Sequence, residues 1–252
     1  MNASTGGYAL LADDLRCLFY IGWKDLRAYY LKPPNISWGI LLPFAFVLAF
    51  AMRNPGDLRA LVPGLLGLTL LFGTSSMEAI VITFERRIGA FERLLLAPVR
   101  LPALLVGKML GGMVFGLTVT AVVLAIALIA FGVERVNWAL LALTLLLSAA
   151  AFAALGAFVS VTAKEVFEAQ TLANFVRFPM IFLGGVFVPV ASMPPVLQIV
   201  ARCLPLTYCV EALRAALGQG VGSQPGLDLL ALLVFTVGLF LATARILARQ
   251  LA

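Results

Sequence analysis

Histidine is absent from this chain of 252 residues, and cysteine occurs only three times. Because histidine is the commonest general base and metal ligand near neutral pH, its absence weighs against many enzyme and metal sites. Cys17, Cys203 and Cys209 do not form a metal-binding pattern. The sequence therefore predicts neither a catalytic site nor a metal site.

Charged residues are also scarce: they make up 12% of the chain, whereas soluble domains contain about a quarter. Hydrophobic residues account for 62%, and the mean hydropathy is +1.05, which excludes a soluble globular protein. The net charge is +6, but the basic residues mostly flank apolar segments, as orientation in a membrane requires. We therefore expect the lipid bilayer as a partner and no binding of nucleic acid.

Two sequence motifs are missing as well, one typical of nucleotide-binding proteins and one typical of hydrolases. The chain contains no G-x-x-x-x-G-K-[ST] loop, so it does not bind ATP through a P-loop. It contains no G-x-S-x-G elbow, and its carboxylates are scattered. The first thirty residues carry several charges and no apolar run before a cleavage site, so we expect no signal peptide.

The N-terminal segment is predicted to lie on the membrane surface. Between residues 8 and 31, apolar residues recur at spacings of 3, 4 and 7, while Asp13, Arg16 and Lys24 fall on the opposite arc. This pattern is typical of an interfacial helix, and a helix packed on a soluble domain is the alternative. Because prolines follow Lys32, we place the end of this first region, 1–34, there.

The rest of the chain, residues 35–252, is predicted to form one transmembrane domain. A crossing takes about 20 apolar residues, and six segments come near that length or exceed it. The expected spans are 36–52, 62–84, 103–132, 138–162, 171–190 and 227–246. Gly111, Gly112 and Gly116 should give the third span a face that allows close helix approach. The predicted fold class is an all-α polytopic membrane protein with six transmembrane helices.

A short charged loop, ERRIGAFERLLLAPVR at 85–100, separates the second and third spans. It holds four Arg and two Glu, and Ile88, Phe91 and Leu95 fall at helical spacing on one side. Short loops rich in basic residues stay in the cytoplasm, and most of the 18 Lys and Arg residues fall on the same predicted side. We therefore expect both termini in the cytoplasm and a surface helix here that a soluble partner binds.

Two ionisable residues, Glu78 and Arg177, fall inside predicted spans at matched depth. An unpaired charge at such a depth costs about 2.5–3.5 kcal/mol on insertion scales. We expect the two side chains to be neighbours in an intramembrane charge pair. They would either line a substrate path or form a structural ion pair, and an arginine reaching toward the interface is a further alternative.

The segment 194–217 interrupts the pattern of spans. Its two apolar stretches, 196–203 and 206–217, are separated by Pro205, and each is too short to cross a membrane. We predict a re-entrant helical hairpin on the outer face, with an ordinary amphipathic outer loop as the alternative. Its predicted gate residues, among which Glu211 and Arg214 should face one another, are Pro205, Tyr208, Glu211 and Arg214.

Two stretches of the chain contain series of short motifs. The first contains Glu85-Arg86-Arg87, Gly89-Ala90-Phe91-Glu92, Leu94-Leu95, Pro98 and Gly107-Lys108. The second contains Pro179-Met180, Phe182-Leu183, Gly185, Pro189, Met193-Pro194, Pro205-Leu206-Thr207-Tyr208 and Leu213-Arg214. In their order, and with six spans, these motifs resemble the permeases of type-2 ABC exporters over nearly the whole chain. Within that family they are most similar to small drug, lipid and lipo-oligosaccharide exporters.

The resemblance implies specific roles for these segments. The first helix would be the interfacial elbow, and the 85–100 loop would be the coupling helix that docks into a separate ATPase. The implied docking residues are Glu85, Arg86, Arg87, Gly89, Phe91, Glu92, Arg93 and Leu95. ATP and Mg would bind to the partner, with no cofactor on this chain. Two permease copies, as a homodimer, would combine with two ATP-binding subunits in a bacterial or archaeal plasma membrane.

The expected function is therefore outward transport of an amphiphilic drug, a lipid or a lipid-linked molecule by a subunit that is not itself an enzyme. With only three Trp, an aromatic lane for stacking sugars is not evident, so a polysaccharide or lipo-oligosaccharide is the alternative cargo. Two remoter alternatives are an ion-driven carrier that uses Glu78 and Arg177, and an intramembrane enzyme of lipid metabolism.

Overall fold

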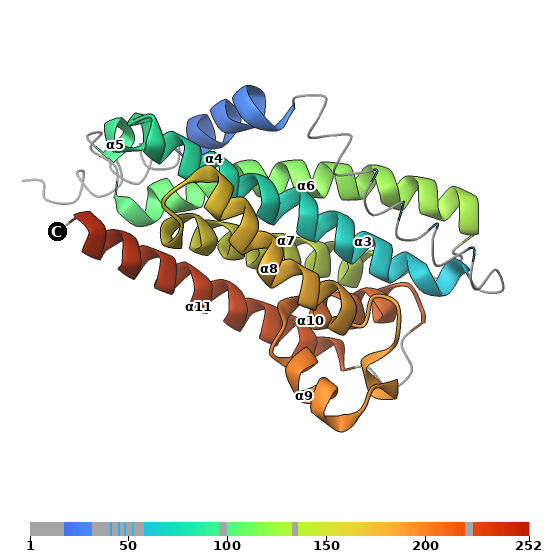
Figure 1. Ribbon diagram of the computed structural model, residues 1–252. Coiled ribbons are helices and arrows are strands. Elements are labelled where there is room, and N and C mark those ends of the chain that lie inside the picture. Colours follow the sequence, from blue (N-terminus) through green and yellow to red (C-terminus); the bar gives the residue numbers. More distant parts are fainter. Residues whose placement is uncertain are drawn as a thin grey trace, which may run out of the picture.

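The computed structural model describes residues 18–31, 58–95, 100–132, 136–219 and 224–251, together with positions 41, 45, 48 and 52. Within these ranges every regular element is helical and no strand occurs, which confirms the predicted all-α class (Figure 1). The predicted first span, 36–52, falls outside the described residues except at four helical positions.

The chain begins with an N-terminal helix at residues 18–30, whose last turn is the π-helix η1 (Leu26–Tyr30). The next helix is continuous but changes type: η2 (Leu58–Leu61), α3 (Val62–Leu71), the π-helix η3 (Phe72–Ser76) and α4 (Met77–Arg87). The remaining elements are α5 (Ala90–Leu95), α6 (Leu101–Phe131), α7 (Trp138–Thr162), α8 (Val166–Leu183), η4 (Val190–Ser192), α9 (Pro195–Arg202), α10 (Pro205–Ala216) and α11 (Pro225–Leu251).

The predicted boundaries agree closely for some spans and fail for one. The fourth span is α7, with the predicted limits 138–162. The fifth was placed at 171–190, but α8 starts at Val166 and ends at Leu183. The helix stops because Gly185 adopts φ 74°, a left-handed conformation that ends a helix and that glycine adopts at little cost.

Within the described residues, four helices are long and apolar enough to cross a membrane: Arg59–Arg87, Leu101–Ala130, Trp138–Thr162 and Pro225–Gln250. A fifth crossing results if α9 and α10, bent by 94° to one another, count as one broken span. α8 is not among the four. The count of six spans therefore stays a prediction, since it also needs α8 and the undescribed first span.

Helix α7 lies in the centre of the bundle and packs against α4, α6, α10 and α11 (Figure 1). The main core combines apolar side chains from α3, α6, α7 and α10, among them Leu66, Val123, Phe152 and Val210. Between helices in a bilayer such side chains stabilise the fold through close van der Waals packing, because lipid tails are as apolar as they are. The outward faces of α6 and α11 are also apolar, as expected of helices that contact lipid.

The glycine face predicted for the third span exists and holds the N-terminal helix and η3 close to α6. A side chain at Gly111 would meet Gly22 and Asp25, and one at Gly112 would meet Glu78. At Gly116 a Cβ would lie 2.3 Å from the Cγ2 atom of Thr74. At Gly112 and Gly116 a side chain would be too close to its neighbours, whereas at Gly111 the contacts of 3.4 Å are ordinary ones. The close approach brings polar residues of three elements together.

Several segments meet at one end of the bundle, which we call the α5 end. Arg86 at the end of α4 donates hydrogen bonds to the Ser160 carbonyl oxygen (3.0 Å) and to Gln250 Oε1 (2.9 Å). These bonds join the last turns of α4, α7 and α11, beside α5 and the N-terminal helix (Figure 1). The short helices η4, α9 and α10 lie toward the opposite end, which we call the α9 end.

Candidate functional site

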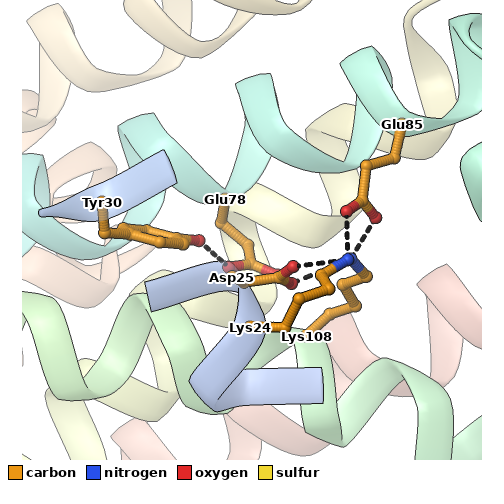
Figure 2. Close-up of polar contacts among 6 residues, drawn as sticks. All are labelled: Lys24, Asp25, Tyr30, Glu78, Glu85 and Lys108. Carbon is orange, nitrogen blue, oxygen red and sulfur yellow. Dashed lines mark hydrogen bonds and ion pairs between the residues drawn. The ribbon is translucent and has the colours of Figure 1, made fainter. Parts of the chain in front are cut away.

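Four charged residues from three elements form a buried network at the α5 end, which we call the ion cluster: Lys24, Asp25, Glu85 and Lys108 (Figure 2). Lys24 Nζ lies 2.6 Å from Glu85 Oε1 and 2.9 Å from Asp25 Oδ1. Lys108 Nζ lies 2.8 Å from Asp25 Oδ2 and also contacts Glu85 Oε2. The network joins the N-terminal helix to α4 and α6.

The ion cluster is balanced in charge and largely dry. Glu85 and Lys108 are fully buried and Asp25 almost so, while Lys24 is 45% exposed. Burial alone would lower the pKa of Lys24, but its hydrogen bonds to Glu85 and Asp25 raise that pKa above its ordinary value. Burial raises the pKa of Asp25, and the neighbouring Lys108 opposes that rise. Such a network is costly to break, because removing one member leaves a buried charge unpaired.

Two of the predicted ATPase-docking residues are internal, so their assignment was wrong. Glu85 belongs to the ion cluster. Phe91 is 2% exposed and belongs to a core cluster with Ile82, Leu104 and Leu105. The short helix α5 is amphipathic as expected, but its apolar face covers the protein core. An isolated sequence does not say whether such a face meets protein, lipid or a partner.

The remaining predicted docking residues divide into three groups. Arg86 holds neighbouring helix ends, as described above, and Gly89 makes the turn between α4 and α5 with φ 70°. Arg87 and Arg93 are exposed. The side chains of Glu92 and Leu95 lie outside the part that the structure describes. The docking role of these positions stays a prediction.

The exposed residues on either side of α5 and within it include both basic and apolar side chains. Ile88 was expected to share a face with Phe91, but it ends α4 and is 52% exposed. Arg100, just before α6, is also exposed. We call these exposed residues the α5 surface: Arg87, Ile88, Arg93 and Arg100. The surface carries positive charge beside one large apolar side chain.

Glu78 and Arg177 do not form the predicted charge pair. Glu78 Oε2 accepts a hydrogen bond from the Tyr30 hydroxyl (2.7 Å), as Figure 2 shows, and lies beside Gly112 of α6. The neighbouring residue on α4, Ala79, faces Ala173 of α8 instead. Successive residues of a helix point about 100° apart, so Glu78 turns toward α6 when Ala79 faces α8. Among the described residues no ion pair includes Glu78 or Arg177.

The two short helices α9 and α10 confirm the predicted break at Pro205, which is the first residue of α10. Their positions in a bilayer, and the gate role, stay predictions. Tyr208 donates a hydrogen bond to the Arg202 carbonyl oxygen (2.7 Å) and so fixes the corner between the helices. Glu211 and Arg214 lie close enough for their charges to attract one another, but Arg214 donates its hydrogen bond to the Gly185 carbonyl oxygen (2.6 Å) and forms no ion pair within the described chain.

Comparison with known proteins adds the decisive observation. The model of the ABC-2 type transporter family matches residues 16–217, from the N-terminal helix to the end of α10. The chain belongs to this family. As an ABC-2 type permease it is the membrane subunit of an ABC transporter, and the family implies partnership with an ABC ATP-binding subunit.

Individual relatives agree with this assignment. The inner membrane transport permease YadH of Escherichia coli strain K12 is 29% identical over 194 residues, which cover 75% of this chain and 74% of YadH. Nodulation protein J of Sinorhizobium fredii is 34% identical over 73 residues, 29% of this chain and 28% of that protein. ABC transporter G family member 20 of Dictyostelium discoideum is 29% identical over 183 residues, 71% of this chain and 25% of that protein.

These findings confirm the resemblance noted in the sequence and the prediction of a transport subunit instead of an enzyme. They also place the chain in a membrane, in agreement with its apolar helices. An ion-driven carrier and an intramembrane lipid enzyme are thereby set aside. The sequence missed three members of the ion cluster, Lys24, Asp25 and Lys108. For Lys108 the sequence did contain an indication of this role, because a lysine inside an apolar segment needs a partner of opposite charge.

Proposed function

We propose that this ABC-2 type permease exports an amphiphilic drug, a lipid or a lipid-linked molecule, driven by an ATPase that docks on the α5 surface. The observation that carries the proposal is the position of that surface directly beside the ion cluster. Arg87 and Ile88 end the same helix that contributes Glu85. A force applied at the α5 surface therefore acts on a helix that is ionically tied to two others.

The ion cluster makes these three elements move together. Glu85 is bonded to Lys24 of the N-terminal helix and to Lys108 of α6. Ion pairs buried in a medium of low polarity resist separation, so a shift of α4 carries the other two elements with it. α6 then connects the α5 end to the opposite end of the bundle through its 31 residues, which span about 46 Å.

In the proposed assembly two copies of this chain combine with two ATP-binding subunits. ATP and Mg bind to the partner, whose closure moves the two α5 surfaces. Both termini and the α5 end face the cytoplasm, and the α9 end faces outward. An ATP-induced change must come from a contact that differs between the two states, and the α5 surface supplies that contact.

The proposal is tested by purifying the tagged chain from its native membrane in mild detergent. We expect an ATP-binding protein with a P-loop to co-purify and the complex to hydrolyse ATP. Replacing Arg87 with Glu should weaken association about tenfold, equivalent to about 1.4 kcal/mol, because it reverses a charge on the proposed interface.

The matched control is Arg202→Glu, the same charge reversal on the exposed α9 at the opposite end. It should leave association and ATP hydrolysis unchanged. Equal loss in both variants, or no loss in Arg87→Glu together with a second variant, Ile88→Asp, would contradict docking on the α5 surface. Absence of any co-purifying ATPase activity would contradict the function itself.

A further inference from the structure

Arg177 is a buried cation for which the described chain supplies no counter-charge. Its side chain is 2% exposed, and it is among the largest buried side chains of the described residues. One nitrogen, Nη1, donates to Asn174 Oδ1 at 3.2 Å, and the guanidinium lies 5.5 Å from the centre of the Phe72 ring. The other nitrogen, Nη2, is buried and has no hydrogen-bond partner among the described residues. Within the described residues, therefore, one nitrogen of Arg177 donates no hydrogen bond and no carboxylate neutralises its positive charge.

The depth of Arg177 makes this arrangement costly. It lies in the middle of α8, about 16 Å along the axis from Val166 and about 9 Å from Leu183. An arginine in an apolar zone ordinarily extends to water or pairs with a carboxylate. Arg177 does neither within the described residues, since it is buried and forms no ion pair.

The predicted first span does not supply a counter-charge either. Residues 32–56, which include that span, contain no Asp or Glu, so the span holds no carboxylate for Arg177. Neither the described residues nor this span neutralises the guanidinium, and an anionic cargo would do so.

The residues beside Arg177 are suited to an anion. Asn174 accepts from Arg177 through its oxygen, which leaves its amide nitrogen available as a donor. Gln170, one turn before Asn174, carries a second side-chain amide whose nitrogen is a hydrogen-bond donor. Its buried oxygen is an acceptor and contributes nothing to anion binding. Residues 170, 174 and 177 follow the spacing of one helix face, so their polar groups form a single stripe along α8.

An apolar strip runs next to this polar stripe. Phe175, Phe178 and Phe182 are 76%, 49% and 57% exposed, and they lie along one side of α8. These rings lie on the outer side of α8, at the level along the helix where Arg177 lies on the inner side. Charge and apolar surface therefore occur on neighbouring faces of one helix.

We propose that Arg177 and Asn174 bind the anionic headgroup of the exported amphiphile, a carboxylate or a phosphate, while its apolar chain lies along the phenylalanines of α8. This inference rests on the proposed export function and specifies its substrate class. A planar guanidinium binds carboxylate and phosphate oxygens through two parallel hydrogen bonds, and here only one of its terminal nitrogens is engaged. An uncharged or cationic amphiphile would leave Arg177 unneutralised.

The test measures binding to the full-length chain in nanodiscs of phosphatidylcholine. The probes are spin-labelled stearic acid, ionised at alkaline pH, and its uncharged methyl ester, which has the same chain. The protein-immobilised fraction of each probe is read from its electron paramagnetic resonance spectrum. We expect the acid to bind about tenfold more tightly than the ester, and Arg177→Gln to abolish this preference.

Two variants separate a binding role from a structural one. Arg177→Lys keeps the charge but loses the two-pronged geometry, so it should retain part of the preference. Arg245→Gln, an exposed arginine of α11, is the matched control and should retain all of it. If Arg177→Gln fails to fold, Arg177→Lys and Asn174→Ala serve in its place, and each should reduce the preference.

Equal binding of acid and ester by the unmodified chain would overturn the proposal. So would an unchanged preference in Arg177→Gln, or in both replacement variants. Displacement of the labelled acid by an equal concentration of glycerol 3-phosphate would show that a free anion suffices and would overturn the amphiphile assignment. None of these results bears on co-purification of an ATPase, so failure here is distinguishable from failure of the export function.

Discussion

Lys108 illustrates how single residues connect the elements of this permease. It is the eighth residue of α6, and its fully buried ammonium group contacts Asp25 of the N-terminal helix and Glu85 of α4. Without it, the two carboxylates would face each other with only the half-exposed Lys24 between them. Lys108 therefore contributes more to the free energy of unfolding than an ordinary surface lysine does.

We predict that Lys108→Met destabilises the protein by about 3–5 kcal/mol, the range for breaking a buried ion pair from one side. The reason is that both carboxylates lose their buried partner while methionine supplies only packing. The measurement is thermal unfolding of the purified chain in detergent, followed by tryptophan fluorescence.

Lys164→Met is the control, because Lys164 is exposed in the short turn between α7 and α8. It should change stability by less than about 0.5 kcal/mol. Equal effects of the two substitutions would mean that the ion cluster does not hold the N-terminal helix and α6 to α4.

At the scale of elements, the π-helix η3 governs how closely α3 and α4 approach α6 and α7. On one side of η3, Thr74 packs against Gly116 of α6. On the other side, Ser75 packs against Gly156 of α7. A methyl group at Gly156 would lie 2.7 Å from the Ser75 backbone oxygen and 2.8 Å from the Glu78 Cβ atom. Because these atoms belong to the backbone or lie next to it, the new methyl group would fit only if the two helices moved apart.

We expect Gly156→Ala to destabilise the permease by about 1–3 kcal/mol through overpacking. Gly238→Ala is the matched control, because Gly238 also lies inside a long helix and no atom would contact its new methyl group within 4 Å. It should stabilise α11 by about 0.5–1 kcal/mol, since alanine loses less backbone entropy. Opposite signs in thermal unfolding are the predicted outcome, and stabilisation by both substitutions would count against close packing at η3.

At the scale of the whole molecule, the contacts gather the N-terminal helix, α5 and the ends of α7 and α11 at one end. Lys24 reaches Glu85, and Arg86 reaches Gln250, so residues from both terminal segments lie beside the same loop. Those contacts settle that these segments share an end of the bundle. The charge distribution then predicts that this end faces the cytoplasm.

We predict that a cysteine at Gln224, exposed before α11, reacts with a membrane-impermeant thiol reagent added outside the cell. A cysteine at Lys164 should react only after the membrane is opened. Both variants are made in a background in which the three native cysteines are replaced. The reverse labelling pattern would overturn the proposed orientation and, with it, a cytoplasmic docking site on the α5 surface.

Much of the helical framework could be predicted from the sequence because apolar length and punctuation determine it locally. The limits of α7 and the break between α9 and α10 were predicted correctly, and both depend on nearby residues such as Asn137 and Pro205. Asn137 caps α7 by accepting a hydrogen bond from the Leu140 amide. The end of α8 was misplaced because a left-handed glycine at 185 is indistinguishable in sequence from the other glycines of this chain.

The sequence predicted where the candidate site lies along the chain, but it did not predict which residues of the site contact one another. Sequence alone indicated a charged turn at 85–100 and two buried charges, Glu78 and Arg177. It could not show that Glu85 pairs with Lys108, since those partners are 23 residues apart and lie on different helices. Depth along a helix follows from residue number, but the direction of a side chain around the bundle depends on which neighbours each helix meets.

By itself, therefore, the sequence determined that this is a helical membrane protein, that it contains no P-loop motif, and that a basic turn follows its second apolar segment. Only the tertiary structure decided that Glu78 lies against Tyr30, that Phe91 is internal and that Arg177 has no carboxylate partner among the described residues. The physical reason is that the hydropathy of a segment depends only on its own residues. Which buried charges pair depends instead on how each helix is rotated about its axis, and the close packing at Gly112, Gly116 and Gly156 fixes those rotations.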